Sequence, residues 1–287
     1  MPHSFDQRLA GSYDALSAKL RQAGDYVAAN PIDVATRSLR AVSADSGLAP
    51  ATFSRLARAL DFENFEALRD SMRSKLGRRM NGFADRAGRL QQEHGGEGGS
   101  FVAAHLRACL ENVEQMGREI DTDLLERVVD QLHGSRKVVA LGGLGSTGPV
   151  EYLSYMANFC ADNWSLASRM GASLGAGLTG LDERDALIIV TMPPFSARSI
   201  SAARMAAAQG VYVIVITDTH ACPALRHAAA HFIMPTDSPH FYSSYVATLA
   251  LIETMIGMLA ARAGNAARER IAEVEESNRR LEETWPG

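Results

Sequence analysis

Cysteine is scarce in this chain. Its 287 residues include only three, Cys109, Cys160 and Cys222, which lie far apart and form no C-x-x-C pair. This odd, widely spaced set argues against a disulfide framework and against a zinc site built on cysteine. The eight histidines show no metal-ligand spacing, and no G-x-S-x-G motif marks a nucleophilic serine. We therefore expect neither a metal site nor a cofactor.

Long apolar runs and a secretory leader are also missing. No run reaches the roughly 18 residues that a membrane helix needs, and the nearest case, 245–261, is interrupted by Glu253. The N-terminus carries Asp6 and Arg8 without an apolar segment behind a basic head, so no secretory signal is expected. The 46% apolar content is enough for a sizeable core. The sequence predicts a soluble, cytoplasmic protein with no membrane partner.

The chain has no overall excess of positive charge, but its charge is unevenly distributed. The net charge is −4. Residues 1–80 carry 12 Lys and Arg against 9 Asp and Glu, whereas the remainder carries 17 against 24. A mildly basic head on an acidic body favours a polyanionic partner for the head alone.

The spacing of apolar residues changes along the chain. The first 80 residues show helical spacing and almost no strand signal, and a Gly-rich polar stretch at 94–100 then indicates a linker. Beyond it, short apolar strands alternate with helical stretches, which indicates βαβ crossovers in a doubly wound parallel sheet. We expect strands at 137–141, 187–191 and 211–217, a weaker one at 231–234 and, least clearly, one at 164–167. The predicted architecture is an all-α domain (1–80), a linker (81–100) and an α/β domain of the αβα sandwich type (101–287).

Residues 39–56 have the spacing of a helix-turn-helix motif. Gly47 can adopt the positive φ of the tight turn, and Pro50 is tolerated in the first turn of the second helix. Leu48, Phe53 and Leu56 are spaced to pack that helix onto the first. Small and hydroxyl side chains then lie near the helix start with arginines behind them, as entry into a major groove requires. The residues expected to face outward toward DNA are Ala51, Thr52, Ser54, Arg55 and Arg58. A small helical bundle with a solvated face is the alternative.

The run from Ala51 to Arg69, ATFSRLARALDFENFEALR, resembles the head of the RpiR family of bacterial transcriptional regulators. In that family an A-T-[IVF]-S-R-[FL]-[AC]-[RK]-x-L-G-[FY]-x-[GN]-[FY] stretch forms the recognition helix and the segment directly after it. Asp61 stands where the family usually has Gly, and Ser43 and Ala49 replace the usual Ala and N-capping Ser. An aspartate can still adopt the left-handed conformation, and the missing cap weakens the helix start by ~1 kcal/mol. The resemblance implies a helix-turn-helix that binds operator DNA.

Three loops follow predicted strands at their carboxyl ends, where open α/β sheets bind ligands. The first, GGLGSTG at 142–148, can present backbone N–H groups and hydroxyls to an anion at a helix N-terminus. The second, MPPFSARS at 192–199, offers two serine hydroxyls and the guanidinium of Arg198; an N-cap by Ser196 beside a surface arginine is the alternative. The third loop, 217–220, is expected to form a pocket wall. The first loop also satisfies a G-x-G-x-x-G pattern with Asp162 as the later acid, so nicotinamide binding is a rival interpretation.

Together these loops resemble the SIS (sugar isomerase) domain that accompanies RpiR-type heads. The first loop matches at Gly143, Gly145 and Ser146, and the second is similar to [FM]-[PRS]-x-[YF]-S-x-x-[ST] in the regulators. Pro193-Pro194 replaces the Ser/Gly pair of the enzymatic S-x-S-G-x-T loop. The resemblance implies that hydroxyls of these loops contact a phosphorylated sugar. The ligand-binding residues expected are Gly143, Gly145, Ser146, Ser196, Arg198, Ser199 and His240.

The combined resemblance implies a transcriptional regulator whose body senses a phosphorylated sugar or a related carbohydrate. An isomerase or other phosphosugar enzyme with an accessory head is the alternative. Such an enzyme needs a general base, for which Glu151 and His240 are candidates; an exposed helical carboxylate and a loop residue are the simpler interpretations. We predict no catalytic residue and no enzymatic activity. The expected partners are operator DNA, a sugar phosphate and further copies of the chain in a homodimer or homotetramer, with the apolar helix 245–261 as an interface or a core helix.

Overall fold

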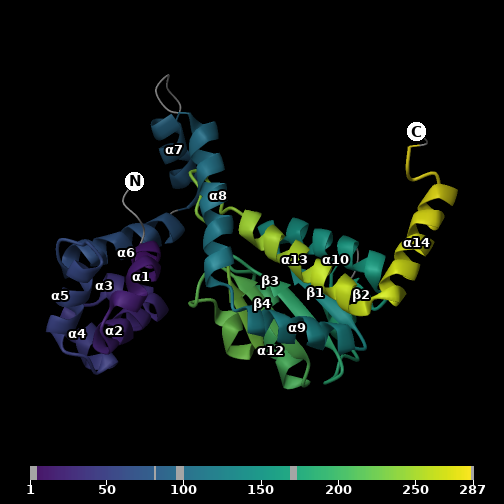
Figure 1. The fold of residues 1–287 in the computed structure, drawn as a ribbon, viewed down its shortest axis with the longest axis horizontal. Coiled ribbons are helices and arrows are strands. Elements are labelled where there is room, and N and C mark those ends of the chain that lie inside the picture. Colours follow the sequence, from purple (N-terminus) through teal and green to yellow (C-terminus); the bar gives the residue numbers. More distant parts are fainter. Residues whose placement is uncertain (1–4, 81, 95–99, 169–172, 286–287) are drawn as a thin grey trace. The chain divides into compact units, whose positions relative to one another are not determined.

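The computed structural model describes residues 5–80, 82–94, 100–168 and 173–285. Contacts divide the chain into two compact units, Met1–Gln92 and Glu93–Gly287. Most of the Gly-rich stretch assigned to the linker, residues 95–99, lies outside the described residues. The N-terminal unit is coloured purple to blue in Figure 1, and the C-terminal unit runs from blue to yellow.

The N-terminal unit is helical. Its core is formed by side chains from several helices, with Phe53 fully buried between the rings of Tyr26 and Phe65 in edge-to-face contacts. The helices are α1 (Phe5–Ser12), the 3-10 turn η1 (Tyr13–Ala15), α2 (Ala18–Ala29), α3 (Pro31–Thr36), α4 (Leu39–Ser46), α5 (Pro50–Ala59), α6 (Phe65–Met80) and α7 (Phe83–His94).

Helices α4 and α5 are joined by a short, well-bonded turn. Gly47 ends α4 with a φ of 69°, in the left-handed region that glycine adopts without a steric penalty. The side chain of Ser43 donates a hydrogen bond to the carbonyl of Leu48, and the hydroxyl of Ser46 accepts one from the Leu48 N–H. Polar groups of α4 therefore hold the turn, and the buried side chain of Leu48 fixes it to the core.

The stretch 81–100 contains more structure than the predicted linker. Helix α7 occupies Phe83–His94, most of that stretch. Apolar residues at Phe83, Ala87 and Leu90 repeat at the spacing of one helix face, which explains why this segment is helical.

The C-terminal unit is a five-stranded parallel sheet in the order β2-β1-β3-β4-β5, so the predicted fold class is confirmed. Every predicted strand is present to within one residue at each end. The strands are β1 (Val138–Gly142), β2 (Trp164–Leu166), β3 (Ala186–Val190), β4 (Tyr212–Thr217) and β5 (Ala230–Ile233). The helices are α8 (Phe101–Glu119), α9 (Thr122–Gly134), η2 (Leu144–Ser146), α10 (Thr147–Cys160), α11 (Leu174–Leu178), α12 (Ala197–Ala208), η3 (Pro223–His227), α13 (Val246–Ala263) and α14 (Asn265–Arg280).

Both faces of the sheet are covered because side chains alternate along each strand. In β3, Ile188 and Val190 pack against α9, α10 and α13, whereas Leu187 and Ile189 pack against α11 and α12. Figure 1 shows α10 and α13 side by side along the first of these faces. The result is a three-layer αβα sandwich with two separate apolar cores.

Helix α13 is the long apolar helix expected from the sequence. By length and composition alone it is apolar enough to cross a membrane. Seven of its eighteen residues are buried, and Leu251, Ile252 and Met255 lie in the core on the α10 face of the sheet. The helix therefore serves as a core element of this unit.

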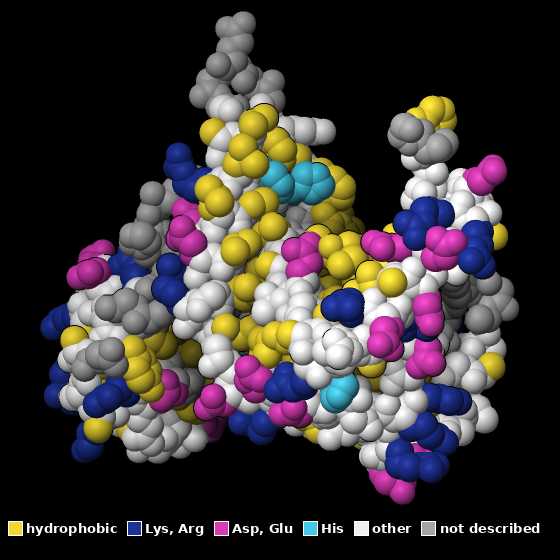
Figure 2. All heavy atoms as spheres, turned by 45° about the vertical axis from the view of Figure 1, so that its right-hand side comes forward, with side chains coloured by type: hydrophobic (Ala, Val, Ile, Leu, Met, Phe, Trp, Pro, Cys, Tyr) yellow, Lys and Arg dark blue, Asp and Glu magenta, His cyan; other side chains and the backbone are white. Residues whose placement is uncertain are grey.

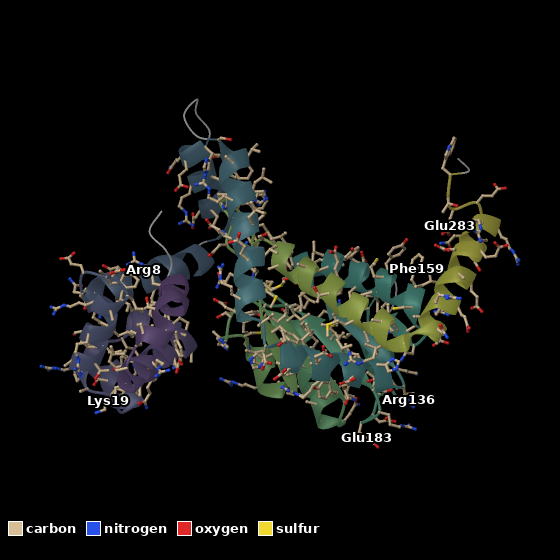
Figure 3. The ribbon with its side chains drawn as sticks, viewed as in Figure 1. Arg8, Lys19, Arg136, Phe159, Glu183 and Glu283 are labelled. Atoms are coloured by element: carbon tan, nitrogen blue, oxygen red, sulfur yellow. The ribbon has the colours of Figure 1, made fainter. Side chains whose placement is uncertain are left out.

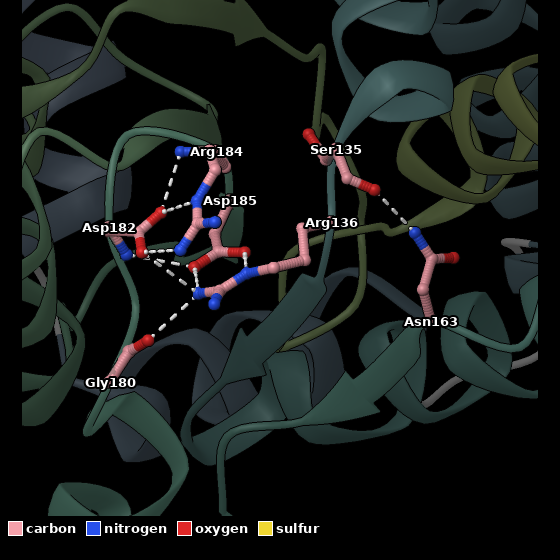
Figure 4. A network of polar contacts seen from close by, with 7 residues as sticks. All are labelled: Ser135, Arg136, Asn163, Gly180, Asp182, Arg184 and Asp185. Atoms are coloured by element: carbon pink, nitrogen blue, oxygen red, sulfur yellow. Dashed lines mark hydrogen bonds and ion pairs between the residues drawn. The ribbon is translucent and has the colours of Figure 1, made fainter.

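An ion-pair network lies at the amino ends of the strands. Arg136, just before β1, binds the buried carboxylate of Asp185, just before β3, through Nε (3.0 Å) and Nη2 (2.5 Å). The same guanidinium donates to the carbonyl of Gly180 (Figure 4). Arg136 and Glu183 mark this end of the unit in Figure 3. Because it lies opposite the carboxyl ends of the strands, this network stabilises the sheet and is not part of a ligand site at those ends.

Candidate functional site

The strand order reverses between β1 and β3, which makes this the topological switch point of the sheet. In open parallel sheets, ligands bind outside the carboxyl ends of the strands at that point. The first and second loops predicted from the sequence leave β1 and β3 here and lead into α10 and α12. Two helix N-termini, whose backbone N–H groups attract anions, therefore begin beside the switch point.

Ser196 and Ser199 meet the first loop at Gly143. A Cβ atom placed on Gly143 would lie 2.6 Å from the Ser196 hydroxyl oxygen and 3.6 Å from that of Ser199. Glycine is therefore required for this close approach of the two loops. The structure thus brings together three of the predicted ligand-binding residues at one place.

Ser199 has a buried hydroxyl that lacks a hydrogen-bond partner. The residue is 0% exposed, and no partner for its oxygen exists among the described residues. Leaving such a group unpaired costs about 1–3 kcal/mol. Ser196 has a different role in the folded chain, because its hydroxyl caps α12 by accepting the Ser199 N–H at 3.4 Å.

Two tyrosines cover the rest of the first loop. The buried hydroxyl of Ser146 is 2.9 Å from the hydroxyl of Tyr245. A Cβ atom on Gly145 would overlap the hydroxyl oxygen of Tyr242, whose ring stacks on Tyr245 with 6.4 Å between centroids. Gly145 and Ser146 are therefore in the same site as Gly143, under a pair of phenol rings.

The Tyr245 hydroxyl remains protonated at neutral pH. Burial raises its pKa to about 12, partly opposed by the hydrogen bond with Ser146. A neutral phenol can donate its proton to the Ser146 oxygen and so leave the Ser146 proton free to point at a ligand. Tyr245 is thus placed to orient Ser146.

Arg198 and His240 lie at the margins of this arrangement. The Arg198 guanidinium is exposed and donates to the hydroxyl of Ser168 at 3.2 Å, on the loop that follows β2. The Nδ1 atom of His240 accepts the Tyr242 N–H at 3.1 Å, which holds the turn that carries the tyrosines. The ring of His240 also lies 6.2 Å from that of Phe101 and 6.4 Å from that of His105, in the first turns of α8.

Leu144 is in a strained conformation within the first loop. Its φ is 56°, in the left-handed region, and its side chain is 64% exposed. A non-glycine residue there costs of order 1 kcal/mol and is common at ligand-binding loops. Glu151, the other candidate base, is exposed on α10. Among the described residues, no group of three His, Cys, Asp or Glu is placed to hold a metal ion.

The outer face of α5 carries most of the residues predicted to meet DNA. Ala51, Arg55 and Arg58 are exposed, and Ser54 is half-buried with its hydroxyl bonded to the carbonyl of Pro50 in its own helix. The prediction that Thr52 faces outward is wrong, because it is only 3% exposed. Thr52 precedes Phe53 and lies one turn before Leu56, so it belongs to the buried stripe of the helix.

Sequence reasoning missed Tyr242 and Tyr245 as parts of the site. Both come from the segment before α13, which is distant in sequence from the first loop. The one available signal was the position of two tyrosines in a polar stretch immediately before an apolar helix. Nothing in the spacing indicates that this segment folds back over Gly145.

Comparison with known proteins identifies the fold of the C-terminal unit. Residues 168–258 match the family model of the SIS domain. The sugar isomerase domain of an RpiR transcription factor from Sphaerobacter thermophilus superposes with a TM-score of 0.57 at 21% identity, over 61% of this chain and 97% of that chain. NanR of Vibrio vulnificus, complexed with ManNAc-6P, gives 0.57 at 17% identity over 97% of this chain and 99% of that chain.

A protein of E. coli CFT073 in complex with a sugar phosphate superposes with a TM-score of 0.50 at 14% identity, over 61% of this chain and 95% of that chain. A comparison with curated protein sequences finds no match. At these identities the likeness concerns the fold, and the C-terminal unit is an α/β SIS domain.

Proposed function

We propose that this chain is a DNA-binding transcriptional regulator of the RpiR family, whose SIS domain senses a phosphorylated sugar. The observation that carries the proposal is the buried Ser199 hydroxyl without a partner, beside Ser196 and Gly143 at the switch point of the sheet. Hydroxyl donors and two helix N-termini at one place suit a phosphate group. The bound sugar phosphates of NanR and of the E. coli protein support this ligand class.

The N-terminal unit supplies the DNA-binding half of the proposal. Helix α5 follows a tight glycine turn after α4, and its outer face carries Arg55 and Arg58 behind the small residue Ala51. A recognition helix needs this order, because a bulky residue at its tip would block the major groove. We assign base and phosphate contacts to these residues and Ser54, and none to the buried Thr52.

In the proposed mechanism, the ligand shifts the population of geometries in a homo-oligomer. A phosphorylated sugar alters DNA binding only if it binds one geometry more tightly than the other. Two recognition helices then change their separation, to which paired half-sites on DNA are sensitive. We also propose a cytoplasmic location, since α13 is largely accounted for as a core helix.

An aldose–ketose isomerase is the competing function, and the two candidate bases argue against it. His240 uses Nδ1 to hold the Tyr242 N–H, and Glu151 is exposed on α10. A general base must lie within hydrogen-bond reach of the proton it removes. We therefore propose that the chain has no catalytic activity.

Ligand binding is tested by calorimetric titration of the full chain. The panel contains inorganic phosphate, ManNAc-6P, pentose 5-phosphates, hexose 6-phosphates and the matching unphosphorylated sugars. We expect at least one phosphorylated sugar to bind and its unphosphorylated form to bind at least tenfold more weakly. Ser199→Ala should weaken binding by about 10- to 100-fold, as the loss of a hydrogen bond to a charged group does. Binding of free sugars and phosphosugars with equal affinity would refute a phosphate site. Incubation with the same compounds also tests for isomerised products, which the proposal does not expect.

DNA binding is tested with duplexes selected from a random pool by the wild-type chain. Arg55→Ala and Arg58→Ala should weaken binding of the selected duplex and lower the salt dependence by about one counterion each. Arg204→Ala, an exposed arginine on α12 with the same loss of charge, is the matched control and should bind normally. Equal behaviour of the three variants would exclude α5 as the recognition helix.

A further inference from the structure

Helix α8 carries an apolar stripe that its own unit does not cover. Val102, Leu106, Leu110 and Val113 are 65%, 57%, 66% and 36% exposed. Their spacing of four, four and three residues places them on one face of the helix. Figure 2 shows hydrophobic side chains gathered along this upright helix. The opposite face of α8 is already used, because Asn112 is buried and bonds to the backbone of Asp237.

A contiguous exposed stripe of this kind is unusual on a soluble protein and marks an interaction surface. The charges beside it define the partner. Arg107, Glu111, Glu114 and Arg118 follow one another along the flank of the stripe, so the flank carries both signs. A purely anionic partner such as nucleic acid would be repelled by the two glutamates. A partner with the same mixed pattern in reversed order would be attracted.

The stripe is symmetric under reversal of the helix direction. If two α8 helices cross in antiparallel orientation about a two-fold axis near residue 108, Leu106 lies opposite Leu110 of the partner subunit. The same axis places Val102 opposite Val113 of the partner subunit. Each apolar side chain thus meets one of similar size, as a self-complementary two-fold interface requires.

The flanking charges agree with the same axis. In an antiparallel pair, equivalent flanks of the two helices face each other. Arg107 then lies within about two residues of Glu111 of the partner subunit, an offset of ~3 Å along the helix axis. The symmetry repeats this contact, so two opposite-charge pairs form. A parallel pair would instead bring Arg107 beside its own copy and Glu111 beside its own copy, which is unfavourable.

We propose that this face of α8 is a homodimer interface, in which the stripe of Val102, Leu106, Leu110 and Val113 packs in antiparallel orientation against its copy. The interface gives the self-association of the proposed regulator a location. Because its test measures assembly and neither DNA nor ligand binding, a negative result would leave the proposed function untouched.

The first test is the mass of the full-length chain by analytical ultracentrifugation across a concentration series. We expect wild type to dimerise or form a larger even-numbered assembly. Leu106→Glu and Leu110→Glu should weaken dimerisation at least 100-fold, because each places two buried charges at the centre of the seam. Leu281→Glu, which changes a leucine that is 69% exposed outside the stripe, is the matched control and should assemble as wild type does. Circular dichroism checks that each variant is folded.

The second test uses the charges and does not depend on burying a new side chain. Arg107→Glu alone and Glu111→Arg alone should each weaken dimerisation by about 10- to 30-fold, since two attractive surface pairs become repulsive. The two single variants mixed together should form heterodimers with affinity near that of wild type, because every pair is again of opposite sign. The double variant R107E/E111R should also recover. A monomeric wild type, a dimer indifferent to the leucine changes, or single charge variants not rescued by mixing would overturn the proposal.

Discussion

The hydrogen bond between Ser146 and Tyr245 allows a prediction with an asymmetry that the structure fixes in advance. The two hydroxyl oxygens are 2.9 Å apart, but Ser146 is 1% exposed whereas Tyr245 is only partly buried. In Tyr245→Phe, the buried Ser146 hydroxyl loses its partner, which costs about 1–3 kcal/mol. In Ser146→Ala, the tyrosine hydroxyl can bond to water, so only the net worth of the bond, about 0.5–1.5 kcal/mol, is lost.

Urea unfolding of the full-length variants measures this difference. Trp164 is buried in β2 and reports on the C-terminal unit, whereas Trp285 is 91% exposed and changes little on unfolding. We expect Tyr245→Phe to lower the free energy of unfolding more than Ser146→Ala. The double variant should cost about 1 kcal/mol less than the sum of the two, because the same bond is counted twice in that sum.

The ligand affinity of the same variants should follow the opposite order. If Ser146 donates to a phosphate and Tyr245 only orients it, Ser146→Ala should weaken binding of the phosphosugar by about 10- to 100-fold. Tyr245→Phe should then have a smaller effect. Additive unfolding energies, or a larger loss of stability in Ser146→Ala, would refute the assigned pairing. A larger loss of affinity in Tyr245→Phe would refute the orienting role of the tyrosine.

Three further predictions concern single backbone or charge features. Asp61 has a φ of 58°, so Asp61→Gly should raise the free energy of unfolding of the N-terminal unit by about 0.5–1 kcal/mol, whereas Asp61→Ala should lower it, as urea titrations of both variants will show. Gly145→Ala places a methyl group against a tyrosine hydroxyl and should weaken phosphosugar binding measured by calorimetry; Gly148→Ala, with nothing within 4 Å, should bind normally. Arg136→Ala leaves the buried carboxylate of Asp185 without its main partner and should cost about 3 kcal/mol of unfolding free energy. The hydrogen bonds from Arg136 lower the pKa of Asp185, so the stability they provide is present above the ordinary carboxyl range and is lost as the pH falls through the pKa of the folded state; in Arg136→Ala the stability should therefore fall less steeply below about pH 4.

The sheet was predictable because its signals are local. Each central strand is a short apolar run bounded by glycine or polar residues, and burial on both faces permits no polar interruption. Parallel pairing then follows from the helices between strands, and the position of the loops follows from parallel pairing. Helix α14 had no such signal, because it is strongly polar and buries only Ala267 among its described residues. The amphipathic pattern of α7 was obscured by the Gly-rich stretch that follows it.

The site was predictable only for residues that directly follow strands. Ser146, Ser196 and Ser199 occur within a few residues of the ends of β1 and β3, so the topology alone brings them to one edge. Tyr242 and Tyr245 depend on a long-range fold-back, which no local pattern encodes. Thr52 was misassigned because the buried stripe of α5 is wider than two residues per turn, as it packs against α2, α4 and α6.

The central claim is that occupation of the SIS site by a phosphorylated sugar changes DNA binding by the head. The most direct test is the affinity of the full chain for a duplex selected from a random pool, measured by fluorescence anisotropy with and without each compound of the phosphosugar panel. The account predicts that at least one phosphosugar shifts this affinity tenfold or more, and that Ser146→Ala and Ser199→Ala abolish the shift without changing DNA affinity in its absence. Failure to select any duplex, or an affinity that no phosphosugar alters, would contradict it.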